Sequence, residues 1–176
     1  MNAPQYPLPE SYWVEPGRLL AGEYPGGFTD FETRKRLTSL LTAGFDAFLD
    51  LTRPDELQPY QPVLAEEASL LGLTIAYHRF PIGDFGLPTH PQMTEILNTL
   101  DTSLTAGRKI YLHCWGGIGR TGTAVGCYLV RHGFSGKAAL RQLAEWWNTV
   151  PKSARYPHSP ETKAQRKFIL TWHELA

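Results

Sequence analysis

The chain has 176 residues, of which 42% are hydrophobic and 19% are charged. This is enough apolar material for one sizeable core and too short a chain for two ordinary domains. Lysine plus arginine and aspartate plus glutamate each total 17, so no net charge favours nucleic acid or an anionic membrane, and any anion must be bound locally. The sequence has neither a signal-peptide pattern nor an apolar run of membrane-spanning length, which predicts a cytoplasmic protein. Nothing in the composition marks an interface, so we expect a monomer.

The only two cysteines, Cys114 and Cys127, cannot form a disulfide framework, and neither has zinc-ligand spacing. The six histidines show no metal spacing either. We therefore expect no metal and no cofactor. A reducing compartment fits this cysteine usage and would keep a reactive thiol available. Cys127 falls on the apolar face of a predicted helix, which favours a place in the core.

The N-terminal third of the chain predicts an arm, a strand and a helix. Residues 1–17 contain four prolines and are expected to form an extended arm, not a packed element, against a single domain of residues 18–176. Residues 18–27 then predict a short edge strand ending in a turn. The sequence Thr29-Asp30-Phe31-Glu32 is a capping box, and Gly44 is a suitable end for the helix that it starts. The apolar face predicted for this helix consists of Phe31, Leu37, Leu40 and Leu41.

Further strands are predicted over residues 45–51, 74–82 and 109–113, and further helices over residues 63–71, 91–105, 120–132, 136–148 and 160–175. Ser159 is the expected N-cap of the last helix, with Pro160 in its first turn. This alternation predicts an α/β fold: a central, mainly parallel sheet of about four to five strands, flanked by helices on both faces. Ligands bind such sheets at the carboxyl ends of the strands. Three predicted loops begin there, namely residues 52–54, 83–86 and 114–119.

The third of these loops belongs to the stretch HCWGGIGRTGT, residues 113–123. Its glycines can point successive backbone N–H groups at one spot, and the helix that follows directs its positive end there. Arg120 can bind two oxygens of the same anion. These groups also favour the thiolate form of a cysteine, and Cys114 lies at the end of the strand. The sequence therefore predicts a cradle for a tetrahedral dianion with a sulfur nucleophile at its floor.

The order His-Cys, five residues, Arg-Thr resembles the signature of the cysteine-dependent protein tyrosine and dual-specificity phosphatases. The resemblance implies their fold, and it implies that Cys114 attacks phosphorus, Arg120 binds the phosphoryl oxygens and Thr121 helps the thiolate leave in the second step. His113 would tune the thiolate through a hydrogen bond. The backbone N–H groups that would bind the phosphate belong to Trp115, Gly116, Gly117, Ile118, Gly119 and Arg120.

Two other segments resemble parts of the same family. The loop FPIGDFGLP places Asp84 where dual-specificity phosphatases carry their general acid, although an aspartate beside glycine is also common in an ordinary turn. The segment SPETKAQ resembles the kinase-associated subgroup and small bacterial relatives, which implies that Gln165 faces the loop and orients the hydrolytic water. Gln165 can equally be a surface residue of a helix start. Arg53 is expected either to contact substrate or to pair with Asp55 or Glu56.

The resemblance implies a phosphomonoester hydrolase that acts through a phosphocysteine intermediate on a phosphorylated protein or another phosphomonoester. The chain has no room for the segments that bury phosphotyrosine deeply, which implies a shallower pocket open to phosphoserine, phosphothreonine and phosphotyrosine. Phosphoinositide or inositol phosphate hydrolysis is the alternative. The resemblance disfavours it, because phosphoinositide phosphatases of the same superfamily tend to carry lysines in this loop for the additional phosphates, whereas residues 115–119 carry no lysine. A catalytically idle phosphate-recognition module is the third possibility. The sequence does not name the physiological substrate.

Overall fold

A computed structural model describes residues 6–174 of the chain. Its centre is a five-stranded sheet in the order β1-β2-β5-β3-β4. The strands are β1 (Ser11–Glu15), β2 (Leu19–Gly22), β3 (Ala47–Asp50), β4 (Ala76–Arg79) and β5 (Ile110–His113). All neighbouring pairs are parallel except β1 with β2. The predicted α/β class with a mainly parallel central sheet is therefore confirmed.

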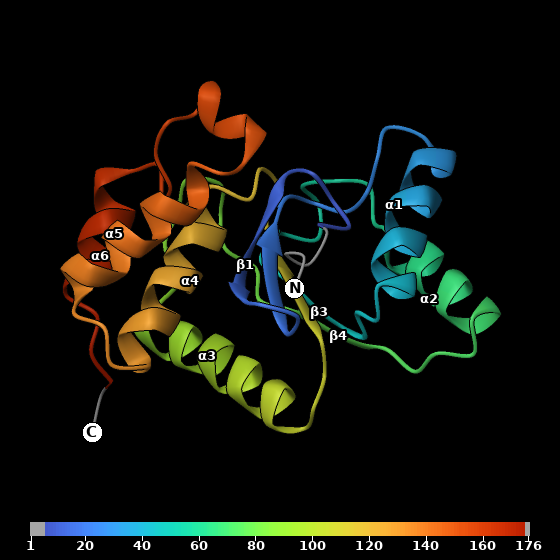
Figure 1. The fold of residues 1–176 in the computed structure, drawn as a ribbon, viewed down its shortest axis with the longest axis horizontal. Helices are drawn as coiled ribbons and strands as arrows, with labels where there is room; N and C mark the ends of the chain where they lie inside the picture. Colours follow the sequence, from blue (N-terminus) through green and yellow to red (C-terminus); the bar gives the residue numbers. More distant parts are fainter. Residues whose placement is uncertain (1–5, 175–176) are drawn as a thin grey trace.

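Helices cover both faces of the sheet (Figure 1). On one side lie α1 (Asp30–Thr42) and α2 (Gln61–Leu70), and on the other lie α3 (His90–Thr105), α4 (Gly119–Arg131), α5 (Gly136–Trp147) and α6 (Lys163–Leu170). A short 3-10 helix, η1 (Pro151–Ala154), follows α5. Each face has its own apolar cluster against the sheet, as a parallel sheet buried on both faces requires.

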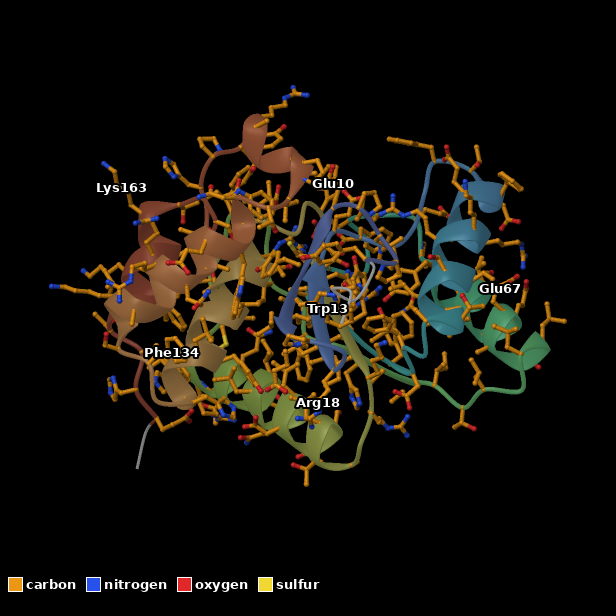
Figure 2. All side chains as sticks on the ribbon, viewed as in Figure 1. Glu10, Trp13, Arg18, Glu67, Phe134 and Lys163 are labelled. Atoms are coloured by element: carbon orange, nitrogen blue, oxygen red, sulfur yellow. The ribbon has the colours of Figure 1, made fainter. Side chains whose placement is uncertain are left out.

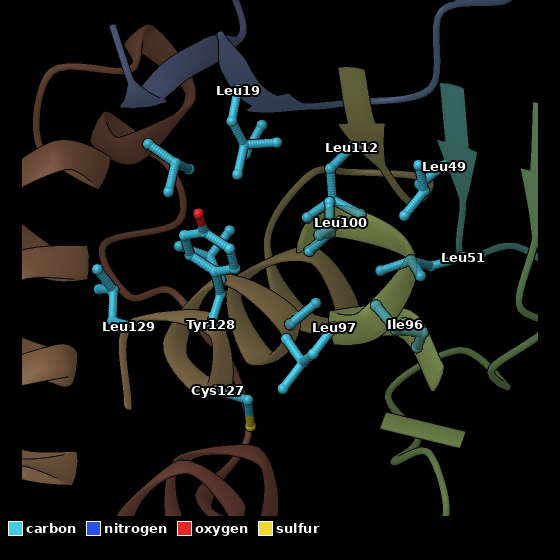
Figure 3. Close-up of a cluster of buried hydrophobic side chains, with 14 of the residues drawn as sticks. Leu19, Leu49, Leu51, Ile96, Leu97, Leu100, Leu112, Cys127, Tyr128 and Leu129 are labelled. Carbon is cyan, nitrogen blue, oxygen red and sulfur yellow. The ribbon is translucent and has the colours of Figure 1, made fainter. Parts of the chain in front are cut away.

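The larger cluster lies between the sheet and α3 and α4. Figure 3 shows Leu97 and Leu100 of α3 and Tyr128 of α4 below the sheet residues Leu19 and Leu112. Cys127 belongs to this cluster and is fully buried, as predicted. Burial raises the pKa of its thiol, so Cys127 is an unreactive packing residue. Over residues 6–174, no helix combines the length and the apolar character needed to span a membrane.

The first helix begins as its sequence predicts. The Thr29 side chain accepts from the Glu32 backbone N–H, and the Glu32 side chain accepts from the Thr29 backbone N–H. Gly44 has φ +88° just after the helix, in a conformation suited to glycine. The predicted apolar face is wrong at Phe31, whose exposed fraction is 76%. Phe31 lies in the first turn, and the buried residues there begin at Thr33.

The expectation that residues 1–17 form no packed element is wrong for Ser11–Glu15. This run, SYWVE, is the proline-free part of the arm and carries three β-favouring residues in a row. It pairs antiparallel with β2 as strand β1, so β2 is an inner strand and not the predicted edge. The prolines that predicted an irregular chain lie before and after this run, and none lies within it, so the run is free to pair as a strand. The first five residues of the predicted arm lie outside the described residues.

The predicted start of the last helix is also wrong. Helix α6 begins at Lys163, with Thr162 as N-cap and Gln165 completing a capping box. Ser159 does not cap a helix, because its hydroxyl donates instead to the carbonyl of Ile118 (2.8 Å). Pro160 follows it through a cis peptide bond and precedes the helix. The segment between η1 and α6 therefore packs against the loop of residues 114–119.

Candidate functional site

The loops after β3 and β4 meet at the guanidinium of Arg120, which directly follows the third predicted loop, residues 114–119. Of the residues in the other two predicted loops, Asp84 contacts it, and residues 52–54 do not bond to it. The Arg120 side chain has an exposed fraction of 2% and lies in the first turn of α4. Its Nη1 donates to the carbonyl of Ile82 (2.9 Å), and its Nη2 donates to Asp84 Oδ1 (3.2 Å). Glu56, in the loop after β3, accepts a hydrogen bond from Nη1 through Oε2 (2.7 Å) and another from Nη2 through Oε1 (2.5 Å). The guanidinium is thus held in one orientation by the loops after β3 and β4.

Glu56 is the site residue that the sequence prediction missed, since it was considered only as a partner of Arg53. Burial by itself would raise the pKa of Glu56. The hydrogen bonds that Glu56 accepts and the charge of Arg120 lower this pKa by more than burial raises it, so the pKa lies below its ordinary range. Glu56 is therefore ionised and forms a bidentate pair with Arg120. Arg53 is exposed and pairs with Asp55 at 3.6 Å, in line with its salt-bridge alternative. The sequence signal that could have identified Glu56 is its place as a carboxylate in a loop at the carboxyl edge of the sheet.

The loop of residues 114–119 is held by its carbonyl groups. The carbonyl of Trp115 accepts from the Tyr24 N–H (2.9 Å), and that of Gly116 accepts from Lys152 Nζ (3.2 Å). The carbonyl of Ile118 accepts from the Ser159 hydroxyl. In a trans peptide the N–H of the next residue points opposite to the carbonyl. With three carbonyls bound by groups outside the loop, the following N–H groups are directed to its inside, as an anion cradle requires.

Glycine is required at position 117 of this loop. Gly117 has φ +74°, and a Cβ there would lie 2.6 Å from the carbonyl carbon of Gly22 and 2.8 Å from the amide nitrogen of Glu23. A side chain would meet backbone atoms that cannot yield. The loop therefore packs directly on the end of β2. Cys114, which opens the loop, has an exposed fraction of 2%.

His113 and Asp50 lie beneath the loop, at the ends of β5 and β3, and both are fully buried. The Nδ1 of His113 lies 3.2 Å from the Cys114 carbonyl, and its Nε2 lies 2.7 Å from the Tyr60 hydroxyl. Burial lowers the pKa of His113, so the ring is neutral, with Nδ1–H donating to the carbonyl and Nε2 accepting from Tyr60. Burial by itself would raise the pKa of Asp50. The charge that His113 carries when it is protonated, together with hydrogen bonds from Thr52 and Tyr77, outweighs burial and keeps the pKa of Asp50 below its ordinary value.

These two groups predict a loss of stability in acid. His113 titrates near pH 6.5 in the unfolded chain and at lower pH when folded. Its contribution is therefore complete above about pH 6.5 and is lost as the pH falls toward the folded pKa. Asp50 adds a loss at lower pH, below its unfolded value of about 3.9. Urea unfolding at several pH values should show the free energy of unfolding falling below about pH 6.5, by up to about 1.4 kcal/mol per pH unit for His113.

His113→Asn should flatten this slope, whereas His78→Asn, at an exposed position of β4, should leave it unchanged. An equal slope in the wild type and the His113 variant would show that His113 does not control acid stability. Measuring slopes rather than absolute stabilities keeps the comparison valid if the His113 variant is less stable overall.

Asp84, Thr121 and Gln165 also lie at this end of the sheet. Besides its pair with Arg120, Asp84 accepts from the Phe85 N–H (3.1 Å) through Oδ1. Gln165 is fully buried, and its Nε2 donates to the Gly86 carbonyl (3.2 Å), so it connects α6 to the loop of Asp84. The buried hydroxyl of Thr121 has no hydrogen-bond partner among the residues that the structure describes. Cys114, Arg120, Asp84 and Gln165 are thus brought to one end of the sheet.

The chain resembles known phosphatases over most of its length. The family model of PTP-SAK, the Swiss Army Knife protein DSP-PTPase phosphatase domain, matches residues 9–169. The mouse protein tyrosine phosphatase domain-containing protein 1 is 25% identical over 172 residues, which are 87% of this chain and 22% of that protein. The chain spans less than half the length of the curated relatives that it matches.

Two solved structures share the fold. That of a kinase associated phosphatase, with serine at its catalytic-site cysteine, superposes with a TM-score of 0.71 at 22% identity, covering 93% of this chain and 96% of that one. That of PTPMT1 in complex with PI(5)P superposes with a TM-score of 0.68 at 16% identity, covering 92% of each chain. Taken together with the family match to residues 9–169, these findings show that the chain belongs to the PTP-SAK family of dual-specificity-type phosphatase domains.

Proposed function

We propose that this chain is a metal-independent phosphomonoesterase that acts through a phosphocysteine intermediate. The observation that carries the proposal is the arrangement of Arg120 over the loop that Cys114 opens. Its guanidinium is oriented by Glu56 and Asp84, and the loop carbonyls are bound on the outside. Such preorganised donors stabilise the charge that develops on a phosphoryl group in transfer.

In the first step, the Cys114 thiolate forms a bond to phosphorus while the bond from phosphorus to the ester oxygen breaks. Asp84 supplies the proton that this oxygen takes up, so the leaving group departs as a neutral alcohol or phenol. Arg120 and the N–H groups of residues 115–120 bind the equatorial oxygens. Hydrogen bonds to Glu56 in the loop after β3, and to Ile82 and Asp84 in the loop after β4, keep Arg120 in place for this role.

In the second step, a water attacks phosphorus, gives its proton to Asp84 and displaces the Cys114 sulfur as a thiolate. The hydroxyl of Thr121 supports this departure by donating to the sulfur, and it has no other partner among the described residues. Gln165 positions the loop of Asp84 through Gly86. Its role in orienting the attacking water remains part of the proposal, as does the role of His113 in tuning the thiolate.

The direct test is chemical trapping of the intermediate. The protein is mixed with an excess of ³²P-labelled phosphotyrosine peptide in EDTA and quenched in acid within one turnover. We expect label on the protein, in a linkage with the pH stability of a thiophosphate, on the peptide that contains Cys114. Hydrolysis without labelled protein would rule out the covalent route, and hydrolysis abolished by EDTA would rule out metal independence.

Asp84→Asn should lower kcat for phenyl phosphate by about 10²-fold, because this leaving group needs a proton that the amide cannot give. The loss should be smaller for p-nitrophenyl phosphate, whose leaving group is stable as an anion. The wild type should show a bell-shaped pH profile that requires a thiolate and a protonated acid, and the variant should lose the alkaline limb. Equal losses for both esters, or an unchanged profile, would make Asp84 a turn residue only.

We further propose that the substrate is a phosphorylated protein, bound in a pocket open to phosphotyrosine, phosphoserine and phosphothreonine, and that the chain works as a cytoplasmic monomer. The uncharged residues 115–119 support a single phosphate in the loop. Inositol phosphates remain the second candidate, because a structure that shares the fold was solved with PI(5)P. Comparing kcat/KM for phosphopeptides and for PI(5)P tests this: a preference for the lipid would overturn the protein substrate.

A further inference from the structure

The segment before α6 places a second carboxylate against the phosphate loop. Gly119, which directly precedes Arg120, is covered by this segment: a Cβ at Gly119 would lie 2.6 Å from Glu161 Oε2 and 2.8 Å from Gln165 Nε2. A side chain at this position would require the ends of the Glu161 and Gln165 side chains to move aside. The Glu161 carboxylate therefore lies directly beside one of the N–H groups that the proposed function assigns to phosphate binding.

The charged and polar groups that act on Glu161 come from two elements. Asp84 belongs to the loop after β4, whereas the Gly119 N–H and the Arg120 side chain belong to the first turn of α4. On its own side of the site, Lys163 at the start of α6 lies at the periphery of the molecule (Figure 2). Burial raises the pKa of Glu161 and the charge of Asp84 raises it further, while Arg120 and the Gly119 N–H lower it; the net shift is upward.

Gln165 does not have the same freedom to act on a bound anion. Its Oε1 accepts from the Thr162 N–H (3.1 Å) and its Nε2 donates to the Gly86 carbonyl (3.2 Å). The amide is therefore engaged on both sides by the backbone of α6 and of the Asp84 loop. Among the residues that the structure describes, no hydrogen bond or ion pair joins the Glu161 carboxylate to another side chain. Glu161 is the group of this segment that can respond to the charge of a ligand.

We propose that Glu161, as a carboxylate, competes with phosphate for the Gly119 N–H, so that the loop binds a phosphate dianion more tightly when Glu161 is neutral. This deepens the proposed function and rests on its assignment of the loop as the phosphate site. A dianion that enters the loop meets the negative charge of Glu161 at close range, and like charges at this distance disfavour binding. Glu161 thereby lowers affinity at neutral pH and makes binding depend on its own protonation.

The test is the dissociation constant of inorganic phosphate, measured by calorimetry on the wild type and on Glu161→Gln at about pH 5 and about pH 7.5. At the higher pH we expect Glu161→Gln to bind about tenfold more tightly than the wild type, the effect of removing one partly solvated like charge. Near pH 5 the ratio should move toward one.

Glu145→Gln is the matched control, because it removes one negative charge from an exposed position of α5, where Glu145 accepts from Gln142, without touching the loop. It should bind phosphate as the wild type does. Equal affinity of wild type and Glu161→Gln at both pH values, or weaker binding by the variant, would overturn the competition. Binding needs no turnover, so a wild type that hydrolyses nothing would reject the phosphatase proposal while leaving this comparison decisive for Glu161.

Discussion

Cys114→Ser is expected to lower the rate of p-nitrophenyl phosphate hydrolysis by about 10⁴-fold or more, the size of loss seen when a covalent nucleophile is removed. A serine hydroxyl is far less ionised than a thiol at the same position and cannot form the phosphocysteine. The fold should be retained, because the two residues have similar size and Cys114 makes no disulfide. The measurement is p-nitrophenol release in EDTA at about pH 6.

Cys127→Ser serves as the control, since Cys127 lies in the core cluster below the sheet (Figure 3) and not in the loop. Below its melting temperature this variant should keep the wild-type rate. Substantial activity in Cys114→Ser would show that another group attacks phosphorus. A wild type that binds phosphate but releases no p-nitrophenol would instead indicate a phosphate-recognition module.

Arg120→Lys is expected to lower kcat/KM by about 10³-fold, although the positive charge is kept. A guanidinium can bind two phosphoryl oxygens while its other N–H groups stay on Glu56 and Ile82, whereas an ammonium presents a single point of charge. The shorter reach of lysine also breaks the bidentate contact to Glu56. Steady-state kinetics with p-nitrophenyl phosphate measure the loss, and the melting temperature shows whether the variant is folded.

The matched control is Arg53→Lys, in the loop after β3 but with an exposed side chain that pairs with Asp55. It should retain activity close to that of the wild type. A large loss of activity in Arg53→Lys would indicate that Arg53 contacts substrate, which was the other alternative predicted for it. A loss of tenfold or less in Arg120→Lys would mean that charge alone is needed at position 120, which contradicts the bidentate role.

The elements of this fold follow from local patterns, because their signals lie within a few residues of one another. The capping box at Thr29 and Glu32 starts α1 as its sequence predicts, and the short apolar run after Lys109 becomes β5. The exceptions have local causes as well. Strand β1 was not predicted because prolines lie on both sides of it. The last helix was predicted to start at Ser159-Pro160, whereas its capping box is formed by Thr162 and Gln165.

By itself, the sequence determined the α/β class and the convergence of Cys114, Arg120 and Asp84 at one end of the sheet, since residue order and parallel strands suffice for both. Only the tertiary structure decided what surrounds them. Glu56 reaches Arg120 across 64 positions of the chain, and Ser159 reaches Ile118 across 41. Such contacts leave no periodicity or spacing in the sequence, because they depend on how separate loops pack at the edge of the sheet. The placement of Glu161 against Gly119 is of the same kind.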